Sequence, residues 1–359
     1  MKPFKLIISG GGTGGHIFPA VAIALEAQKR NAATEILFVG ARGKMEMEKV
    51  PKAGFTIKGL WISGFQRSLS LQNLLFPLKL LSSLVKSYRI LKRFSPDVVV
   101  GTGGFASGPL LQVAQWLNYP TLIQEQNSYP GATNRILSKK VEKICVAYAG
   151  MDSFFPPAKT ILTGNPIRPI TIDQYSQSEA KKFFGLQPNK KTLVVLGGSL
   201  GAKRINELIA LERNFITDFG LQILWQCGER YYETYRTMND KNVIVLPFVQ
   251  EMDQLFAAAD FIISRAGAGS ISELSCVGKP LLLIPSPNVT ANHQYHNANA
   301  LAKVGAALLL EETQLDLFSA TFKRWVSDEN LQLKMKKQLA QFAKPNAAVE
   351  IVNQIYSMI

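Results

Sequence analysis

The sequence is poor in the residues that build disulfides and metal sites. Of its 359 residues, three are cysteines and three are histidines. Cys145, Cys227 and Cys276 are widely spaced and odd in number, which argues against a disulfide framework or a metal knuckle and is typical of a reducing compartment. His293 and His296 lie close together, but no cysteine or acidic residue with metal-ligand spacing accompanies them. We therefore expect three small, buried cysteine side chains and no metal site.

Long hydrophobic runs are also missing. No window contains the roughly 18 consecutive apolar residues that a membrane-spanning helix needs. The apolar run before Gly10 covers only Leu6 to Ile8, which is too short for the core of a secretory signal. We expect the protein to stay in the cytoplasm and any membrane contact to be peripheral.

Acidic residues are scarce relative to basic ones. The sequence has 26 Asp plus Glu against 40 Lys plus Arg, a formal net charge of +14. Such a surface attracts phosphates, nucleic acid or an anionic membrane face. The hydrophobic fraction of 47% is typical of a globular protein, and the length is sufficient for two domains that each bury a core.

Two parts of the chain have the same order of strand, Gly-rich loop and helix. Residues 4–9, 10–16 and 17–25 form the first such unit, and residues 192–196, 197–201 and a helix from about 203 form the second. Further strand-like runs occur at residues 36–39, 97–100, 121–123, 223–225, 243–246, 261–263 and 281–284. Alternating strands and helices predict an α/β protein with two doubly wound parallel sheets.

The domain boundaries follow from this pattern. A Pro-containing stretch at residues 155–169 separates the halves and is the candidate hinge. We expect one domain over residues 1–165, a second over 166–345, and a helix over 346–359 that packs back on the first. Because ligands bind beyond the carboxyl ends of such strands, the chemistry should lie between the domains.

The first Gly-rich loop allows several interpretations. Gly10, Gly12 and Gly15 have the spacing of a dinucleotide fingerprint, but the end of the second strand, residues 38–42, carries no acid to hold a ribose. Arg42 keeps an NADP-binding alternative open, and a tight turn without a ligand is another. His16 follows the loop and is a candidate general base. A histidine that merely starts a helix or packs in a core explains the sequence equally well.

No Asp-x-Asp occurs, so the usual paired carboxylates that hold a divalent ion on a sugar diphosphate are missing. The loop at residues 197–201, Arg168 and helix N-termini could neutralise a diphosphate instead. An ordinary Gly-rich turn with a surface arginine is the alternative. Glu273 could accept hydrogen bonds from ribose hydroxyls, or it could simply favour a helix start.

Residues 74–91 predict a basic amphipathic helix. Its apolar residues recur at spacings of three and four, and its basic residues lie on another face. The apolar set is Leu74, Leu78, Leu81, Val85, Tyr88 and Leu91, and the basic set is Lys79, Lys86, Arg89 and Arg93. Together with residues 60–65 this helix suits an anionic membrane surface, and a core-facing helix with a solvated basic face is the alternative.

An ordered set of motifs runs along essentially the whole chain. They are Gly10-Gly-Gly-Thr-Gly-Gly-His16, Gly101-Thr-Gly-Gly-Phe-Ala-Ser-Gly-Pro109, Gln124-Glu-Gln-Asn127 with Pro130-Gly131 and Asn134-Arg135, Gly164-Asn-Pro-Ile-Arg168, Gly197-Gly-Ser199, Arg265-Ala-Gly-Ala268 to Glu273, and His293-Gln294-Tyr295. In this order they resemble the MurG family of N-acetylglucosaminyltransferases. The resemblance implies a GT-B fold, in which two Rossmann-like domains face a central cleft. It also implies UDP-GlcNAc as donor, lipid I (undecaprenyl-pyrophosphoryl-MurNAc-pentapeptide) as acceptor, and lipid II for peptidoglycan synthesis as product.

The resemblance also implies site residues. The family's donor contacts map onto Thr13, Gly14, Gly15, Asn127, Arg168, Ser199, Val249, Ala268, Gly269, Ser270, Ile271, Ser272, Glu273 and Gln294. Glu273 would hold the ribose and Val249 would lie near the uracil, while His16 is our candidate base for the MurNAc 4-hydroxyl. Two positions depart from the expected pattern: Ser270 replaces a threonine, and His293 replaces a second glutamine before Gln294.

The expected partners follow from the same resemblance. They are UDP-GlcNAc, lipid I and the anionic cytoplasmic face of the bacterial inner membrane, contacted through residues 60–93. Cell-wall synthesis proteins are further candidates, and no cofactor or tightly bound metal is expected. The alternatives are an NADP-dependent oxidoreductase and a non-catalytic protein that binds nucleic acid or membrane. We disfavour nucleic acid because the basic residues are dispersed and no recognised nucleic-acid motif occurs.

Overall fold

The computed structural model describes residues 4–64, 75–198 and 200–359, and the chain divides into two compact units. Unit 1 comprises the residues up to Arg168 together with Lys344–Ile359, and unit 2 comprises Pro169–Ala343. The predicted domain ends differ from this division by three residues or fewer (165 against 168, and 345 against 343).

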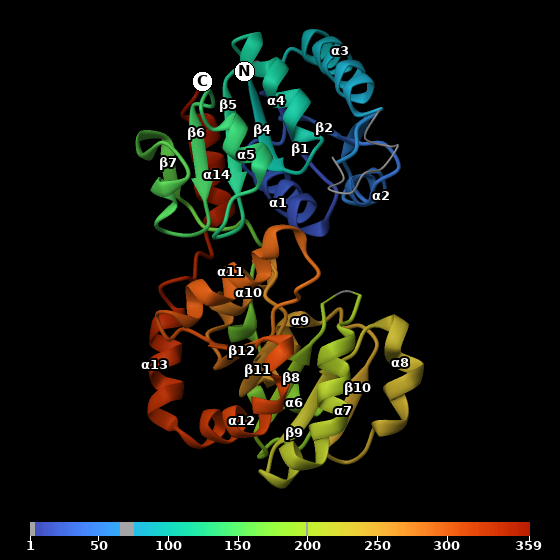
Figure 1. The fold of residues 1–359 in the computed structure, drawn as a ribbon, viewed down its shortest axis with the longest axis vertical. Coiled ribbons are helices and arrows are strands. Elements are labelled where there is room, and N and C mark those ends of the chain that lie inside the picture. Colours follow the sequence, from blue (N-terminus) through green and yellow to red (C-terminus); the bar gives the residue numbers. More distant parts are fainter. Residues whose placement is uncertain (1–3, 65–74, 199) are drawn as a thin grey trace. The chain divides into compact units, whose positions relative to one another are not determined.

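Unit 1 is built on a seven-stranded parallel sheet with the order β3-β2-β1-β4-β5-β6-β7 (Figure 1). The strands are β1 Lys5–Gly10, β2 Glu35–Ala41, β3 Thr56–Leu60, β4 Val98–Gly103, β5 Thr121–Glu125, β6 Lys143–Val146 and β7 Thr160–Leu162. The helices are α1 Gly14–Arg30, α2 Glu46–Lys52, α3 Phe76–Phe94, α4 Ser107–Trp116, α5 Ala132–Leu137 and α14 Ala347–Tyr356. The order reverses direction at β1, as in doubly wound folds.

Both faces of this sheet are buried. On β1, Leu6 and Ile8 belong to the core cluster that contains α1 and α14, whereas Ile7 belongs to the cluster that contains α3 and α4. Successive side chains of a strand point to opposite faces, so burial on both sides explains the uninterrupted apolar run. The C-terminal helix α14 packs against α1 and thereby completes one face of unit 1.

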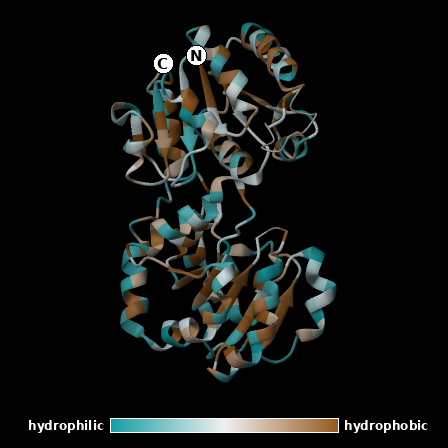
Figure 2. Cartoon of the chain, viewed as in Figure 1, coloured by the Kyte–Doolittle hydropathy of each residue, from teal (hydrophilic) through white to brown (hydrophobic). Residues whose placement is uncertain are grey.

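Unit 2 has a six-stranded parallel sheet with the order β10-β9-β8-β11-β12-β13. Its strands are β8 Thr192–Leu196, β9 Gln222–Gln226, β10 Val243–Leu246, β11 Phe261–Ser264, β12 Leu281–Leu283 and β13 Leu308–Leu309. Its helices are α6 Gln177–Phe183, α7 Lys203–Asp218, α8 Glu229–Tyr235, α9 Met252–Ala258, α10 Ala268–Val277, α11 His293–Ala302, α12 Phe318–Ser327 and α13 Glu329–Leu339. In each unit the apolar residues concentrate on the strands, while the helices carry polar residues on one face (Figure 2).

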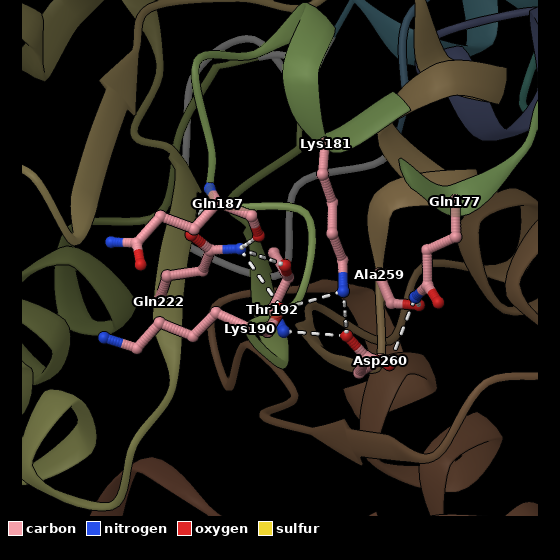
Figure 3. A network of polar contacts seen from close by, with 8 residues as sticks. All are labelled: Gln177, Lys181, Gln187, Lys190, Thr192, Gln222, Ala259 and Asp260. Carbon is pink, nitrogen blue, oxygen red and sulfur yellow. Dashed lines mark hydrogen bonds and ion pairs between the residues drawn. The ribbon is translucent and has the colours of Figure 1, made fainter. Parts of the chain in front are cut away.

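An ion pair between the buried Lys181 and the partly buried Asp260 connects α6 to the amino ends of β8 and β11 (Figure 3). Lys181 Nζ donates to Asp260 Oδ2 at 2.8 Å and to the Lys190 carbonyl at 2.8 Å. The same carboxylate accepts from the Thr192 N–H at 2.8 Å and from Gln177 at 3.1 Å. Lys181 is 3% exposed, so removing the carboxylate that pairs with it would leave a buried, unpaired ammonium group.

The prediction that all three cysteine side chains are buried is only partly confirmed. Cys145 and Cys227 are buried, and burial raises the pKa of Cys145 to about 12 and that of Cys227 to about 11. Cys276 is only partly buried, which corrects the prediction of three buried thiols. It lies in the last turn of α10, where the side chain next to it in sequence, Val277, takes the buried position.

Candidate active site

The first Gly-rich loop connects β1 to α1 in unit 1. Gly12 has a φ of +86°, a left-handed conformation that favours glycine. An ideal Cβ on Gly103, which ends β4, would lie 2.9 Å from His16 Cδ2 and 3.1 Å from His16 Nε2. The imidazole therefore packs directly against the backbone at the carboxyl end of β4.

The hydrogen bonds of His16 define which nitrogen carries its proton. His16 Nδ1 lies 3.0 Å from the Gly11 carbonyl oxygen and 3.3 Å from Thr13 Oγ1. A carbonyl only accepts, so the bond to Gly11 places the proton on Nδ1. Nε2 of the neutral ring is then an acceptor, which is what a general base requires.

A buried carboxylate organises the loop after β5. Glu125 is 2% exposed and accepts from the Asn127 N–H at 3.0 Å, Asn127 Nδ2 at 3.2 Å, the Gly131 N–H at 3.1 Å and Asn134 Nδ2 at 2.9 Å. All four donors are uncharged amides. Glu125 thus fixes the predicted site residue Asn127, and it also brings Asn134 towards Gly103.

Buried amides connect the neighbouring strand ends. Gln126 Nε2 donates to the Thr102 carbonyl at 2.7 Å, and Gln124 Nε2 donates to Asn165 Oδ1 at 2.9 Å. Asn165 Nδ2 in turn donates to the Gln126 carbonyl at 3.0 Å. The quoted motifs at residues 101–109, 124–127 and 164–168 therefore meet at the carboxyl edge of the sheet, and the exposed Arg168 ends this unit.

Glu46, the first residue of α2, was not among the predicted site residues. It is fully buried, and its carboxylate accepts from the Gly12 N–H and from the Ala41 N–H, each at 2.9 Å. The only sequence signal is an acidic residue at a helix start, which normally indicates a solvated, dipole-stabilising position. Its burial depends on the loop from β1, which is distant in sequence.

Unit 2 has an open pocket of about 500 Å³ at the carboxyl ends of its central strands. The lining residues come from the loops after β8, β11 and β12 and from α7 and α11, with one from the segment after β13. They are Gly197, Gly201, Ala202, Lys203, Arg204, Arg265, Ser286, Asn288, Gln294 and Glu312. Three of them are basic and one is acidic, so the pocket suits an anionic ligand.

Arg265 is the best-fixed cation of this pocket. Its Nη2 lies 2.5 Å from Glu312 Oε1, and its Nη1 donates to the Ile284 carbonyl at 3.0 Å. The two side chains are 14% and 13% exposed, so solvent screens the pair only partly. Arg265 was quoted in a motif but was not among the predicted site residues.

The predicted ribose segment forms the start of α10. Ala268 and Ile271 are buried, so they can offer a ligand little beyond their backbone, whereas Gly269 is exposed and Ser270, Ser272 and Glu273 are half-buried. Ser272 Oγ donates to the Ala268 carbonyl at 3.0 Å. The helix N-terminus provides backbone N–H groups that suit a phosphate. The predicted residue Val249 is 4% exposed, and Ser199 lies outside the described residues.

The structure distinguishes between His293 and Gln294. Gln294 lines the pocket, and its Oε1 accepts from the Ser286 N–H at 2.9 Å. His293 instead uses Nδ1 to donate to the Thr290 carbonyl at 2.7 Å and does not line the pocket. Gln294 is therefore the side chain of this pair that a ligand in the pocket can reach.

Both units match models of known domains. Residues 6–146 match the glycosyltransferase family 28 N-terminal domain, and residues 192–351 match the glycosyltransferase family 28 C-terminal domain. A relative from Flavobacterium psychrophilum is 54% identical over 100% of this chain and 99% of its own length. A second relative, from Christiangramia forsetii, is 52% identical over 99% of this chain and 98% of its own length. Both are named UDP-N-acetylglucosamine-N-acetylmuramyl-(pentapeptide) pyrophosphoryl-undecaprenol N-acetylglucosamine transferase.

The solved structures agree with these relatives. Acinetobacter baumannii MurG is 28% identical and superposes with a TM-score of 0.79 over 99% of this chain and 100% of that one. The chain belongs to the MurG family. The calicheamicin glycosyltransferase CalG4, 13% identical with a TM-score of 0.71 over 100% of this chain and 98% of its own, shares the fold alone. The predicted GT-B fold with two Rossmann-like domains is confirmed, and family membership sets aside the oxidoreductase and nucleic-acid alternatives.

The predicted MurG-family site residues divide between the units. Thr13, Gly14, Gly15, His16, Asn127 and Arg168 belong to unit 1, and Val249, residues 268–273 and Gln294 belong to unit 2. The loop residues 13–16 and Asn127 lie at the carboxyl edge of the first sheet, and Gln294 and the start of α10 lie at the carboxyl edge of the second. Ligands bind at these edges in doubly wound sheets.

The predicted amphipathic helix corresponds to α3, but its apolar stripe faces outwards. Leu78, Leu81, Val85 and Tyr88 are 59%, 61%, 44% and 48% exposed. Leu91 is buried, which corrects its assignment to this stripe. At about 100° per residue, the 13 positions from Leu78 place Leu91 roughly 140° around the helix from Leu78, on the side of the buried Ser83 and Ser87. Leu74 lies outside the described residues, as does the segment 65–74 of the predicted membrane region.

Two serines are the fully buried residues at the middle of α3, where Leu80 and Leu84 are partly buried and pack against the hydrophobic core. Ser83 and Ser87 are fully buried, and Ser83 Oγ donates to the carbonyl of Trp61, whose side chain is 45% exposed. Trp61, Leu78, Leu81, Val85 and Tyr88 are called the α3 patch below. The alternative of a core-facing apolar stripe is therefore wrong for the four α3 residues of this patch.

Basic residues accompany the α3 patch. Lys86 Nζ donates to the Gly59 carbonyl at 2.5 Å, and burial, together with the charges of Arg42 and Lys58, lowers the pKa of Lys86. Lys79 Nζ donates to Ser63 Oγ at 3.1 Å. None of the helices that the structure describes is long and apolar enough to cross a membrane.

Proposed function

We propose that this protein transfers N-acetylglucosamine from UDP-GlcNAc to the MurNAc 4-hydroxyl of undecaprenyl-pyrophosphoryl-MurNAc-pentapeptide, lipid I, and so makes lipid II for peptidoglycan. The observation that carries the proposal is the 54% identity, over the full length of both chains, to a relative named for this donor and this acceptor. The anion-suited pocket of unit 2 and the histidine of unit 1 supply groups for the chemistry.

The proposed reaction is an inverting displacement. His16 Nε2 takes the proton from the MurNAc 4-hydroxyl while that oxygen forms a bond to the anomeric carbon of GlcNAc. The bond from that carbon to the diphosphate oxygen breaks, and UDP leaves with the electron pair. Arg168, the loop around Ser199 and the N-terminus of α10 would stabilise the charge on UDP without a metal ion.

The two ends of the donor would have different contacts. Glu273 would accept hydrogen bonds from the ribose hydroxyls, and Val249 would lie near the uracil. Gln294, Arg265 and the loop at residues 197–201 line the pocket that would hold the charged part of the donor. Thr13, Gly14, Gly15 and Asn127 would complete the donor contacts from unit 1.

The acceptor is a lipid, so we also propose that the enzyme works on the cytoplasmic face of the bacterial inner membrane. The α3 patch exposes five large apolar side chains beside lysines, a combination that suits an anionic surface. Each basic residue near such a surface adds about 1 kcal/mol of attraction.

A transfer assay tests the proposal. Labelled GlcNAc would be supplied as UDP-GlcNAc to a lipid I analogue in detergent, with and without EDTA, and with UDP-GalNAc as the control donor. We expect product only when the acceptor is present, the same rate in EDTA, and a preference for GlcNAc. Folded protein that binds UDP but makes no product would contradict the assigned acceptor, and loss of activity in EDTA would contradict the metal-free mechanism.

A further inference from the structure

The side chains of Glu46 and His16 form hydrogen bonds with opposite sides of one peptide group in the first Gly-rich loop. The N–H of Gly12 donates to Glu46 Oε2 at 2.9 Å, and the carbonyl of Gly11 accepts from His16 Nδ1 at 3.0 Å. These two groups belong to the same planar unit, the peptide that joins Gly11 to Gly12. A continuous path of hydrogen bonds therefore runs from the Glu46 carboxylate to the His16 imidazole.

The surroundings of Glu46 are shaped for a carboxylate. Its second oxygen, Oε1, accepts from the Ala41 N–H at 2.9 Å, so both oxygens are used by backbone donors. An ideal Cβ on Gly11 would lie 2.2 Å from Oε1, and one on Gly40 would lie 2.5 Å from Cγ. Both neighbouring backbone segments thus approach closely because they carry glycine, and Glu46 is left with no exposed surface.

The path has a chemical consequence for His16. Hydrogen bonds in a chain polarise one another, so donation from Gly12 to a carboxylate makes the Gly11 carbonyl a stronger acceptor. A stronger acceptor holds the imidazole proton on Nδ1. Thr13 Oγ1, at 3.3 Å from Nδ1, can also donate and would then favour the other tautomer.

We propose that Glu46 is a positioning residue that keeps His16 in the Nδ1–H tautomer through the Gly11–Gly12 peptide. Nε2 then remains able to take a proton. A carboxylate hydrogen-bonded directly to histidine does the same in catalytic triads, and here one peptide group lies between them. The inference rests on the proposed function only for the role of His16 as the base.

Glu46→Gln is the informative variant because it keeps the shape of the side chain. An amide has one acceptor oxygen, so either the Gly12 N–H or the Ala41 N–H must face an NH₂ group. The Gly11–Gly12 peptide is then held less firmly, and the Thr13 hydroxyl competes better for Nδ1. Asp97→Asn is a matched control, because Asp97 Oδ2 accepts from the Lys5 N–H at 2.7 Å at the opposite end of β1.

The measurement is the tautomer of His16 by long-range ¹H–¹⁵N NMR at a pH where the ring is neutral. The chain has three histidines, so the spectrum is simple, and His16→Gln assigns the signal. We expect the Nδ1–H form in the unmodified protein and in Asp97→Asn, and a clear rise of the Nε2–H form in Glu46→Gln. A predominant Nε2–H form in the unmodified protein would overturn the inference, even if the variant failed to fold. An unchanged tautomer in folded Glu46→Gln would overturn it too.

Measuring kcat for Glu46→Gln and His16→Gln distinguishes a failure of the proposed positioning role of Glu46 from a failure of the proposed function. If His16 is the base, Glu46→Gln should lower kcat at least roughly tenfold, because the wrong tautomer cannot take the proton, while KM for UDP-GlcNAc changes less than about twofold. An altered tautomer in Glu46→Gln together with normal transfer by His16→Gln would support Glu46 as the positioning residue and contradict His16 as the base.

Discussion

Each unit contains a hydrogen-bond network centred on one carboxylate, and the two networks lie at opposite ends of their sheets. Glu125 ends β5 in unit 1 and accepts from uncharged amides of the loop that follows and of α5. Asp260 immediately precedes β11 in unit 2 and pairs with the ammonium group of Lys181 (Figure 3). Functional groups gather at the carboxyl edge of such sheets. The same side-chain chemistry therefore organises a loop of the candidate site in one unit and holds a helix against the sheet in the other.

The hydrogen-bond partners of Glu125 and Asp260 explain why the two carboxylates have different roles. A carboxylate that accepts several backbone and amide N–H groups fixes the shape of a loop, and here the loop carries the predicted site residue Asn127. The Lys181–Asp260 pair instead connects a helix to two strand ends, and removing its cation is costly because the partly buried Asp260 charge then loses its partner. Substitutions in the two networks should therefore change different properties.

The largest stability effect is expected for Lys181→Met. It leaves the Asp260 carboxylate without its cation, and because that side chain is 25% exposed we expect a loss of about 3 kcal/mol in the free energy of unfolding, the lower end for a broken buried pair. Urea unfolding followed by tryptophan fluorescence measures it. Tryptophan fluorescence reports mainly on the unfolding of unit 2, because Trp225 and Trp325 are fully buried there. Trp61 and Trp116 of unit 1 are already exposed in the folded protein.

The neighbouring, exposed Lys182 provides the control for this prediction. Lys182→Met should change the free energy of unfolding by no more than about 0.5 kcal/mol. Lys181→Met should also keep the transfer rate of the folded enzyme. A large loss of transfer with little loss of stability would show that the Asp260 network serves the site.

The second prediction concerns Glu125→Gln. The amide cannot accept from all four donors, so we expect a loss of about 1–3 kcal/mol in stability. We also expect transfer to fall roughly 10- to 100-fold, because Asn127 and Asn134 lose their fixed positions. The measurements are kcat and urea unfolding, compared with Asp260→Asn. The comparison fails if Asp260→Asn slows the folded enzyme as much as Glu125→Gln does.

The third prediction concerns membrane binding by the α3 patch. The substitutions that test it should leave the Glu125 and Asp260 networks unchanged. Leu78→Ser with Leu81→Ser removes two side chains of the α3 patch that are about 60% exposed, so stability should change by less than about 1 kcal/mol. Binding to vesicles containing anionic lipid should weaken at least roughly tenfold, since each leucine loses about 1.5–3 kcal/mol of apolar burial. Vesicle flotation measures this.

Leu211→Ser is the matched control for the α3 patch. Leu211 is 78% exposed and stands on α7 of unit 2, whereas the α3 patch belongs to unit 1. Its replacement should leave vesicle binding unchanged. Equal losses from both substitutions would indicate that vesicle binding depends on overall hydrophobicity and not on the α3 patch.

Much of the fold was predictable because its strands are buried on both faces. The predicted strand at residues 192–196 is β8, and the one at 243–246 is β10. Gly-rich loops before helices located the carboxyl edges, where most predicted site residues lie. These signals are local, since they depend on periodicity and on short motifs.

The errors and omissions have two physical causes: contacts between distant segments and, for Leu91, the rotation that accumulates along a helix. Glu46 is buried by a loop that precedes it by more than 30 positions, so its sequence neighbours cannot reveal its role. Leu91 fits a spacing of three or four from Tyr88, yet the accumulated rotation turns it into the core. Similarly, only the orientation of α11 shows that Gln294, and not His293, lines the pocket.

We propose that the two sheet edges have different main roles, proton transfer in unit 1 and binding of the uridine end of the donor in unit 2. The most direct test measures kcat and the Kd for UDP side by side in His16→Ala and Glu273→Ala. We predict that His16→Ala lowers kcat roughly 10²- to 10⁴-fold with an unchanged Kd, and that Glu273→Ala weakens UDP binding about tenfold. Normal turnover by His16→Ala, or unchanged UDP binding by Glu273→Ala, would contradict the account.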